Sequence, residues 1–559
     1  MASLSDLPVE LVDNIVLYLS QPGLYSVIRV NKGLYTSVVP ILYRHVDLFI
    51  PPGNALPRID RFCLAIITDS RKTRQVESVR LGLCPIEGVQ GGQRWLPPDK
   101  NFDDQSMLEK AVDVLRQEMR REPLVATANY LRHAIVMREY SSYAVLILLL
   151  LPSLRRLDVA DEKSATLDYL HTILRNMDSA TIWSHHHPAH VLIDRLSSIT
   201  HVSLLFDRHS GVAYSHENSY ASVDHFINIP NITTLELSIS GSAESQLNAH
   251  YVPNPIVTRV RPTNITTLVF RHSGPFLGVQ RSLLESTPQL RSFTYDIFYD
   301  SSGREREDAR LIDLTGWSDV LQPLRTTLEV LVFSAEYCDT SKYFFNQPRI
   351  GDRVYGYLDL TNFSCLHTLE SPFVFLTGET ELSITTEIYA LLPPNLRHLS
   401  LRPDLSYAQA PFAFDLSILP SALTFTESKT EAQYLMNARM DVSYMFQASL
   451  TLLDQTASLE TIAVWQPADK SLEWFDGQVK EFASKCRNKN VTAKILVPML
   501  LRWKKLEHWD LVREITIFDR LEPADGEVKR FFRHRWGERP LGLASQYHLN
   551  ALRSHQVKL

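Results

Sequence analysis

The chain has 559 residues, of which 57 are basic and 63 acidic, so its formal net charge is −6. This near balance argues against nucleic acid or an anionic membrane surface as the main partner. Hydrophobic residues make up 45% of the chain and charged residues 21%, as in an ordinary globular protein. The longest apolar run, residues 144–151, is far shorter than the roughly 20 residues that a membrane-spanning helix needs.

The five cysteines favour a reducing compartment. They are Cys63, Cys84, Cys338, Cys365 and Cys486. Their number is odd, they lie far apart and they form no Cys-x-x-Cys pair, which argues against a disulfide framework and against a zinc ribbon. No basic segment precedes the N-terminal apolar residues, so a signal peptide is not indicated. We therefore expect a protein of the cytoplasm, the nucleus or both.

The N-terminal residues predict an amphipathic helix. Apolar residues recur every four positions at Leu7, Leu11, Ile15 and Leu19, with polar residues on the opposite face. Pro8 suits the first turn of this helix, where a missing N–H costs no hydrogen bond.

Turn-forming residues divide the rest of this stretch. The Gln-Pro-Gly sequence at residues 21–23 is expected to break the first helix, Gly33 to end a second helix and Pro40 to end a third. A period-two pattern from Tyr43 onward predicts the first strand. Three short helices in about 45 residues can supply only a marginal core. Because these helices are apolar on more than one face, the surplus apolar surface needs a partner, either another chain or the next domain.

A Leu-x-x-Leu-x-Leu pattern then recurs along the chain. Its copies begin at Val76, Leu154, Ile199, Ile232, Ile265, Leu290, Leu328, Leu366, Leu396 and Leu459. The last two apolar positions of each copy alternate about one residue, as in a strand with one buried face, and the first packs the entry turn. Segments such as 167–175 and 431–453 are helix-like. Starts from Leu154 to Leu396 are 25 to 45 residues apart, whereas leucine-rich repeats run about 20–29 residues.

This recurrence predicts an α/β fold, an irregular leucine-rich-repeat solenoid shaped like a horseshoe, with strands on the concave side and helices outside. A set of ordinary α/β domains with parallel strands remains an alternative. We expect a helical domain at 1–48, a linker with an entry strand at 49–75, the repeat solenoid at 76–500, and a C-terminal cap and tail at 501–559.

Three short motifs in residues 1–48 carry a resemblance to a known family. They are Leu7-Pro8-Val9-Glu10-Leu11, Val30-Asn31-Lys32 and Pro40-Ile41-Leu42-Tyr43-Arg44. In this order they resemble an F-box, and residues 144–159 are similar to the entry into the repeats of fungal F-box proteins. A structural alternative is that residues 1–48 only cap the array.

The resemblance implies a non-catalytic, substrate-recognition subunit of an SCF (Skp–cullin–F-box) ubiquitin ligase. Its helical domain would bind a Skp-type adaptor, and through it a cullin, while the repeats would hold an unknown target protein. The residues expected in the small core or against the adaptor are Leu7, Pro8, Leu11, Ile15, Leu19, Leu24, Val30, Leu34, Pro40 and Tyr43. No cofactor, nucleic acid or membrane is expected. A binding scaffold without ligase function is the alternative.

Two other segments suggest chemistry. His185-His186-His187-Pro188-Ala189-His190 could bind zinc, and a metal-dependent hydrolase is a remote alternative. However, Ala189 stands where hydrolytic His-x-His-x-Asp-His motifs need Asp, so we favour a polar loop. No phosphate-binding glycine motif or Gly-x-Ser-x-Gly elbow occurs. The basic and aromatic residues 529–536 could contact RNA, but an amphipathic terminal helix covering the last repeat is the preferred interpretation.

Overall fold

The computed structural model describes about half of the chain. The described residues are 8–17, 19, 21–48, 58–82, 109, 113, 132–160, 196–205, 229–237, 264–273, 278–300, 312–338, 354–379, 382–383, 385–388, 391–408, 428–467, 472–498, 511–522 and 529–534. They belong to two compact units, one of residues 1–237 with 259–264 and the other of residues 238–258 with 265–559. The boundary between these units falls inside residues 76–500. The predicted domain boundaries stay predictions.

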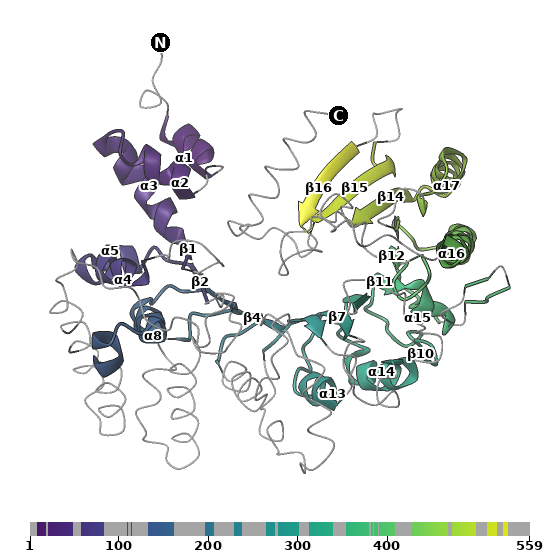
Figure 1. Cartoon of the computed structure of the whole chain (residues 1–559), viewed down its shortest axis with the longest axis horizontal. Helices are drawn as coiled ribbons and strands as arrows, with labels where there is room; N and C mark the ends of the chain where they lie inside the picture. Colours follow the sequence, from purple (N-terminus) through teal and green to yellow (C-terminus); the bar gives the residue numbers. More distant parts are fainter. Residues whose placement is uncertain are drawn as a thin grey trace. The chain divides into compact units, whose positions relative to one another are not determined.

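Three helices open the first unit and are coloured purple in Figure 1: α1 (Val9–Leu17), α2 (Gln21–Val27) and α3 (Lys32–Arg44). We call residues 8–44 the helical module. The Asn31 side chain caps α3 by accepting the Leu34 N–H at 2.8 Å.

The predicted division into three helices is present, but its breaks do not fall at the expected residues. The first helix, α1, ends at Leu17, and residues 21–23 begin α2, with Pro22 in the first turn, where proline is tolerated. Gly33 does not end a helix, because it lies in the first turn of α3. Pro40 does not end the third helix either, since α3 continues through it to Arg44. A proline inside a helix costs about 3 kcal/mol. The next residues, Ile41 and Leu42, pack against the core of the module, and this burial offsets the cost.

Among its described residues, the first unit has five parallel strands in chain order (Figure 1). They are β1 (His45–Asp47), β2 (Ser78–Leu81), β3 (Arg156–Ala160), β4 (His201–Leu205) and β5 (Thr234–Leu237). Their helices are α4 (Ile59–Thr68), α5 (Ser70–Thr73) and α8 (Tyr140–Leu150). The apolar run at 144–151 forms most of α8, which is buried on all sides.

The second unit is also built mainly from parallel strands in chain order. Its parallel strands are β6 (Thr267–Ser273), β7 (Ser292–Asp300), β9 (Val330–Cys338), β11 (Thr368–Pro372), β12 (His398–Arg402), β13 (Thr461–Trp465) and β14 (Thr492–Pro498). Two antiparallel strands, β15 (Leu511–Phe518) and β16 (Lys529–His534), follow at one edge. The strands β8 (Ile312–Asp313) and β10 (Val354–Tyr355) form a separate small pair. The helices are α13 (Gly278–Glu285), α14 (Leu314–Leu321), α15 (Phe373–Thr377), α16 (Ser428–Gln455), α17 (Asp476–Lys489) and a 3-10 turn, η4 (Gln322–Leu324).

Every copy of the repeating pattern coincides with a parallel strand. Each strand from β2 to β7, and β9, β11, β12 and β13, begins two residues after a pattern start. All ten starting residues are buried, from Val76 at 0% exposed to Leu459 at 6%. The second and third pattern positions are buried as well, including Ser371, which takes the third position in β11. The predicted α/β class is therefore confirmed, with mostly parallel strands.

Side chains just before the pattern link neighbouring copies. The Asn231 amide donates to the Ser197 carbonyl at 2.7 Å in the first unit, and the Asn395 amide donates to the Ser364 carbonyl at 2.7 Å in the second. Each bond satisfies a carbonyl at the entry turn of the preceding strand.

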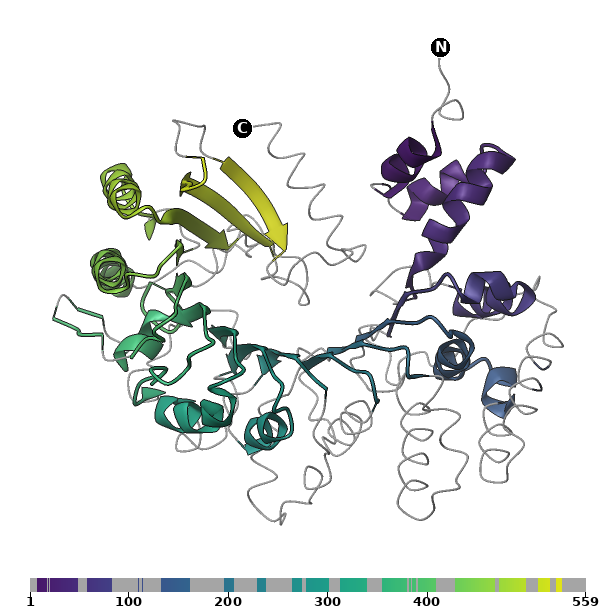
Figure 2. The ribbon, with the colours of Figure 1, turned by 180° about the vertical axis from the view of Figure 1, so that it is seen from behind.

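Near the C-terminus, one further prediction was wrong and one was confirmed. Residues 529–534 form the strand β16 rather than a terminal helix, because β15 offers an open edge that pairs Arg513 with Phe532. The predicted helix at 431–453 is confirmed as part of α16 (Figure 2). The predicted helical segment 167–175 lies outside the described residues.

Candidate partner-binding surface

The helical module closes a small core of its own. Val12 and Val16 of α1, Leu24 of α2, and Leu34 and Val38 of α3 are buried against one another. Partly buried side chains pack around them: Leu19, Val27, Ile28, Ile41 and Leu42. The module is therefore already packed inside without Leu11, Ile15 or any other residue of its exposed face.

Large apolar side chains remain exposed on these helices and on the turn between α2 and α3. Leu11 is 49% exposed, Ile15 40%, Tyr25 57%, Val30 68% and Tyr35 47%. These are five of the fourteen exposed large hydrophobic side chains among the described residues, and they fall within 25 residues of sequence. Leu11 and Ile15 are four residues apart and so share one face of α1. We call these five residues the apolar surface. Such a concentration of apolar side chains is typical of a protein interaction site.

The structure sorts the predicted site residues into different environments. Pro8, Leu11, Ile15 and Val30 are exposed. Leu24 and Leu34 belong to the core, and Leu19 packs against it.

The remaining predicted residues lie elsewhere. Leu7 is outside the described residues. Pro40 is half-buried inside α3, and the ring of Tyr43 stacks on Phe62 of α4 with the centroids 6.1 Å apart.

Sequence reasoning missed Tyr25 and Tyr35. Each directly follows a core leucine, Leu24 or Leu34, and therefore points about 100° away from it around the helix. This offset from a core leucine is the sequence signal that could have identified both tyrosines as exposed. Arg29 lies 5.8 Å from the Tyr25 ring, so the apolar surface has a basic neighbour.

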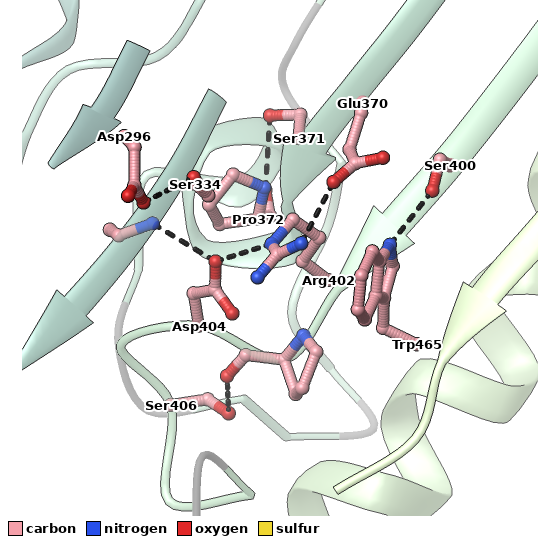
Figure 3. Close-up of polar contacts among 12 residues, drawn as sticks. Asp296, Ser334, Glu370, Ser371, Pro372, Ser400, Arg402, Asp404, Ser406 and Trp465 are labelled. Carbon is pink, nitrogen blue, oxygen red and sulfur yellow. Dashed lines mark hydrogen bonds and ion pairs between the residues drawn. The ribbon is translucent and has the colours of Figure 1, made fainter. Parts of the chain in front are cut away.

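A second cluster of polar groups lies on the strands of the second unit and on the turn that follows β12 (Figure 3). Its centre is Arg402 of β12, whose side chain is 6% exposed. Its Nη1 donates to Glu370 Oε1 at 2.8 Å and its Nε donates to Asp404 Oδ2 at 2.6 Å. The guanidinium also stacks over the Trp465 ring, with Cζ 4.2 Å from the ring centroid. We call these residues, with Asp296 and Ser334, the Arg402 network.

The outer members of the network are also bonded. Asp404 Oδ2 accepts the Ala335 N–H at 2.9 Å, and Asp296 accepts the Ser334 hydroxyl at 2.7 Å. Burial lowers the pKa of Arg402, but the facing carboxylates of Asp404 and Glu370 outweigh burial and hold that pKa above its ordinary value. A permanently charged guanidinium has no proton to exchange, so we assign the network a structural role.

Asp441 of α16 is the described carboxyl group with the strongest perturbation toward neutral pH. Burial raises the pKa of Asp441 to about 7, against four opposing hydrogen bonds from the backbone of Tyr407, Ala408 and Leu382 and the side chain of Ser406. These bonds fasten residues 406–408 to α16, which indicates a fixed loop.

The described residues include no group of three or more His, Cys, Asp or Glu side chains that could hold a metal ion. The cluster His185–His190 lies outside them. Among the described helices, none has both the length and the apolar character to cross a membrane.

No protein-family model matches the chain, and no curated protein matches it.

Proposed function

We propose that the chain is a substrate-recognition subunit of an SCF-type ubiquitin ligase, in which the helical module is an F-box and the strands belong to a leucine-rich-repeat solenoid. The observation that carries the proposal is the apolar surface on a module whose core is already closed. If the module only capped the array, Leu11, Ile15 and Val30 would be expected to pack against the array rather than to be exposed to solvent.

The surface also fits the general chemistry of a protein interface. It combines aliphatic side chains with the aromatic rings of Tyr25 and Tyr35 and the guanidinium of Arg29. Tyrosine and arginine are enriched at protein interfaces. In the proposed complex these side chains contact a Skp-type adaptor, while Leu24 and Leu34 act from the core by holding the helices in place.

The chain itself would perform no chemical step. It would bind a target protein through the repeats and so raise the effective concentration of that target near a ubiquitin-loaded enzyme. The Arg402 network limits where the target can bind, because Asp296, Ser334, Arg402 and Asp404 are all buried. Target contacts in the second unit are therefore expected away from this part of the strand face.

The test is co-purification of the full chain with a Skp-type adaptor and a cullin. The variant is Leu11→Glu with Ile15→Glu, which places two charges on the apolar surface. Burying a leucine or isoleucine contributes about 1.5–3 kcal/mol, so losing both weakens adaptor binding at least about a hundredfold. The matched control is Met436→Glu with Met440→Glu, since these residues are 53% and 51% exposed and also lie four apart on one helix, α16.

Adaptor binding that survives Leu11→Glu with Ile15→Glu would overturn the assigned surface. A wild-type chain that ignores the adaptor would overturn the ligase function. Binding of the adaptor without a cullin would favour a scaffold instead.

A further inference from the structure

The last turn of α3 is held from two sides by the helices that follow it. The Tyr43 ring stacks on Phe62 of α4, with centroids 6.1 Å apart and planes inclined by 25°. On α5, the Lys72 ammonium lies 5.4 Å from the centroid of the same Tyr43 ring. Tyr43 and Phe62 are both half-buried. We call Tyr43, Phe62 and Lys72 the tyrosine clasp.

The helix that carries Phe62, α4, is itself held by ion pairs to a buried carboxylate. On α4, Asp60 is fully buried and pairs with Arg58 at 2.8 Å and with Arg138 at 2.9 Å. Arg138 lies shortly before α8 and adopts the left-handed backbone, with φ of 60°, a conformation that a non-glycine residue keeps only when its surroundings impose it. Phe62 is therefore presented by a helix that is tied to the rest of the unit.

The chain between the module and the strands has no free linker. Residue Arg44 ends α3 and His45 begins β1. The Glu77 N–H donates to the Arg44 carbonyl at 2.9 Å, and His45 Nδ1 lies 2.9 Å from Ser78 Oγ. The pair of Arg44 and Glu77 is 3.0 Å apart, but both side chains are at least a third exposed, so the pair contributes little.

We propose that Tyr43 is a positioning residue that locks the helical module to the first strands, so that both move as one body. The resemblance implies an adaptor contact for Tyr43, and this inference assigns it a different role. Without the clasp, α3 would pivot at the junction of Arg44 and His45, where the backbone changes from helical to extended. The coupling rests on contacts within the first unit. Its consequence for ubiquitin transfer rests on the proposed function.

The test measures distances in the full chain. Spin labels are introduced as unnatural amino acids at Thr36 of α3 and at Arg74, both exposed, which leaves the native cysteines untouched. Wild type is expected to give one narrow distance distribution. Tyr43→Ala removes the stacked ring and the cation–π contact, so the distribution is expected to broaden. Tyr43→Phe keeps both contacts and is expected to restore the narrow distribution.

A second variant distinguishes loss of the stacking contact from misfolding of Tyr43→Ala. Phe62→Ala removes the same stack from the α4 side and is expected to broaden the distribution in the same way. A narrow, wild-type distribution in either alanine variant with unchanged helix content would overturn the proposal, as would broadening in Tyr43→Phe equal to that in Tyr43→Ala.

Adaptor affinity and ubiquitin transfer provide a separate readout. In Tyr43→Ala, adaptor affinity is expected to stay at the wild-type level while ubiquitin transfer to a bound target falls, because the target is no longer held at a fixed place. Loss of adaptor affinity equal to that of Leu11→Glu with Ile15→Glu would overturn the positioning role. If wild type binds no adaptor, the proposed function fails, and the distance measurement still decides the coupling.

Discussion

Replacing Arg402 by methionine tests whether the Arg402 network stabilises the second unit. The Arg402 and Asp404 side chains are each 6% exposed and Glu370 is 16% exposed, so water screens their attraction little. Methionine keeps an apolar contact with Trp465 but leaves two carboxylates without their cation. Removing one partner of a buried ion pair costs about 3–5 kcal/mol, which raises the unfolding equilibrium constant roughly a thousandfold.

The assay is urea unfolding of the full chain followed by far-ultraviolet circular dichroism. Hydrogen exchange at the Ala335 amide, which donates to Asp404, localises the effect. The matched control is Arg291→Met, because Arg291 and Glu329 also form an ion pair, at 3.1 Å, but are 65% and 38% exposed. We expect this control to cost less than about 1 kcal/mol. A cost for Arg402→Met no greater than that of Arg291→Met would refute the reasoning.

Two further predictions concern single positions in the second unit. Asp441 holds its proton up to about pH 7 when folded and loses it near pH 4 when unfolded, so its burial increasingly destabilises the wild type as pH rises from 4 to 7. Asp441→Asn is therefore expected to gain about 2–3 kcal/mol relative to wild type between pH 5 and pH 8 in urea unfolding, and parallel pH profiles would contradict this. Gly356 has φ of +73°, and an added Cβ would lie 2.1 Å from Thr315 Oγ1. Gly356→Ala should cost about 1–3 kcal/mol in thermal unfolding, whereas Gly477→Ala in α17, with nothing within 4 Å of the added Cβ, should cost nothing; equal effects would reject the steric argument.

The strands could be predicted because the pattern that specifies them is local. Three buried positions within six residues mark the entry turn and the inner face of each strand, and no distant contact is needed to recognise them. Pro40 and residues 529–534 were misjudged for the opposite reason. The burial of Ile41 and Leu42 decides that α3 continues, and the open edge of β15 decides that β16 is a strand. Both are tertiary effects that override local preference.

The apolar surface could be predicted only in part. Leu11 and Leu24 are the same residue type at similar positions in neighbouring helices, yet one is 49% exposed and the other 5%. Helical periodicity identifies a stripe on each helix, but the way that three helices pack decides which stripe the module keeps for its core. The choice between Leu11 and Leu24 is therefore a property of the packed module.

The Arg402 network could have been found from the sequence by aligning the repeats. Asp296, Ser334, Pro372, Arg402 and Trp465 each lie six residues after a pattern start, and they stand on successive strands of one sheet. Strand register pairs Asp296 with Ser334 and Pro372 with Arg402. Pairing between β9 and β11 ends at Val332 and Glu370, so the Ala335 N–H turns to the Asp404 carboxylate instead. Arg402 then balances the charge that Asp404 brings. The residues six positions after successive pattern starts thus form one row across the sheet, and the buried Arg402 takes its place in that row beside the carboxylate that it neutralises.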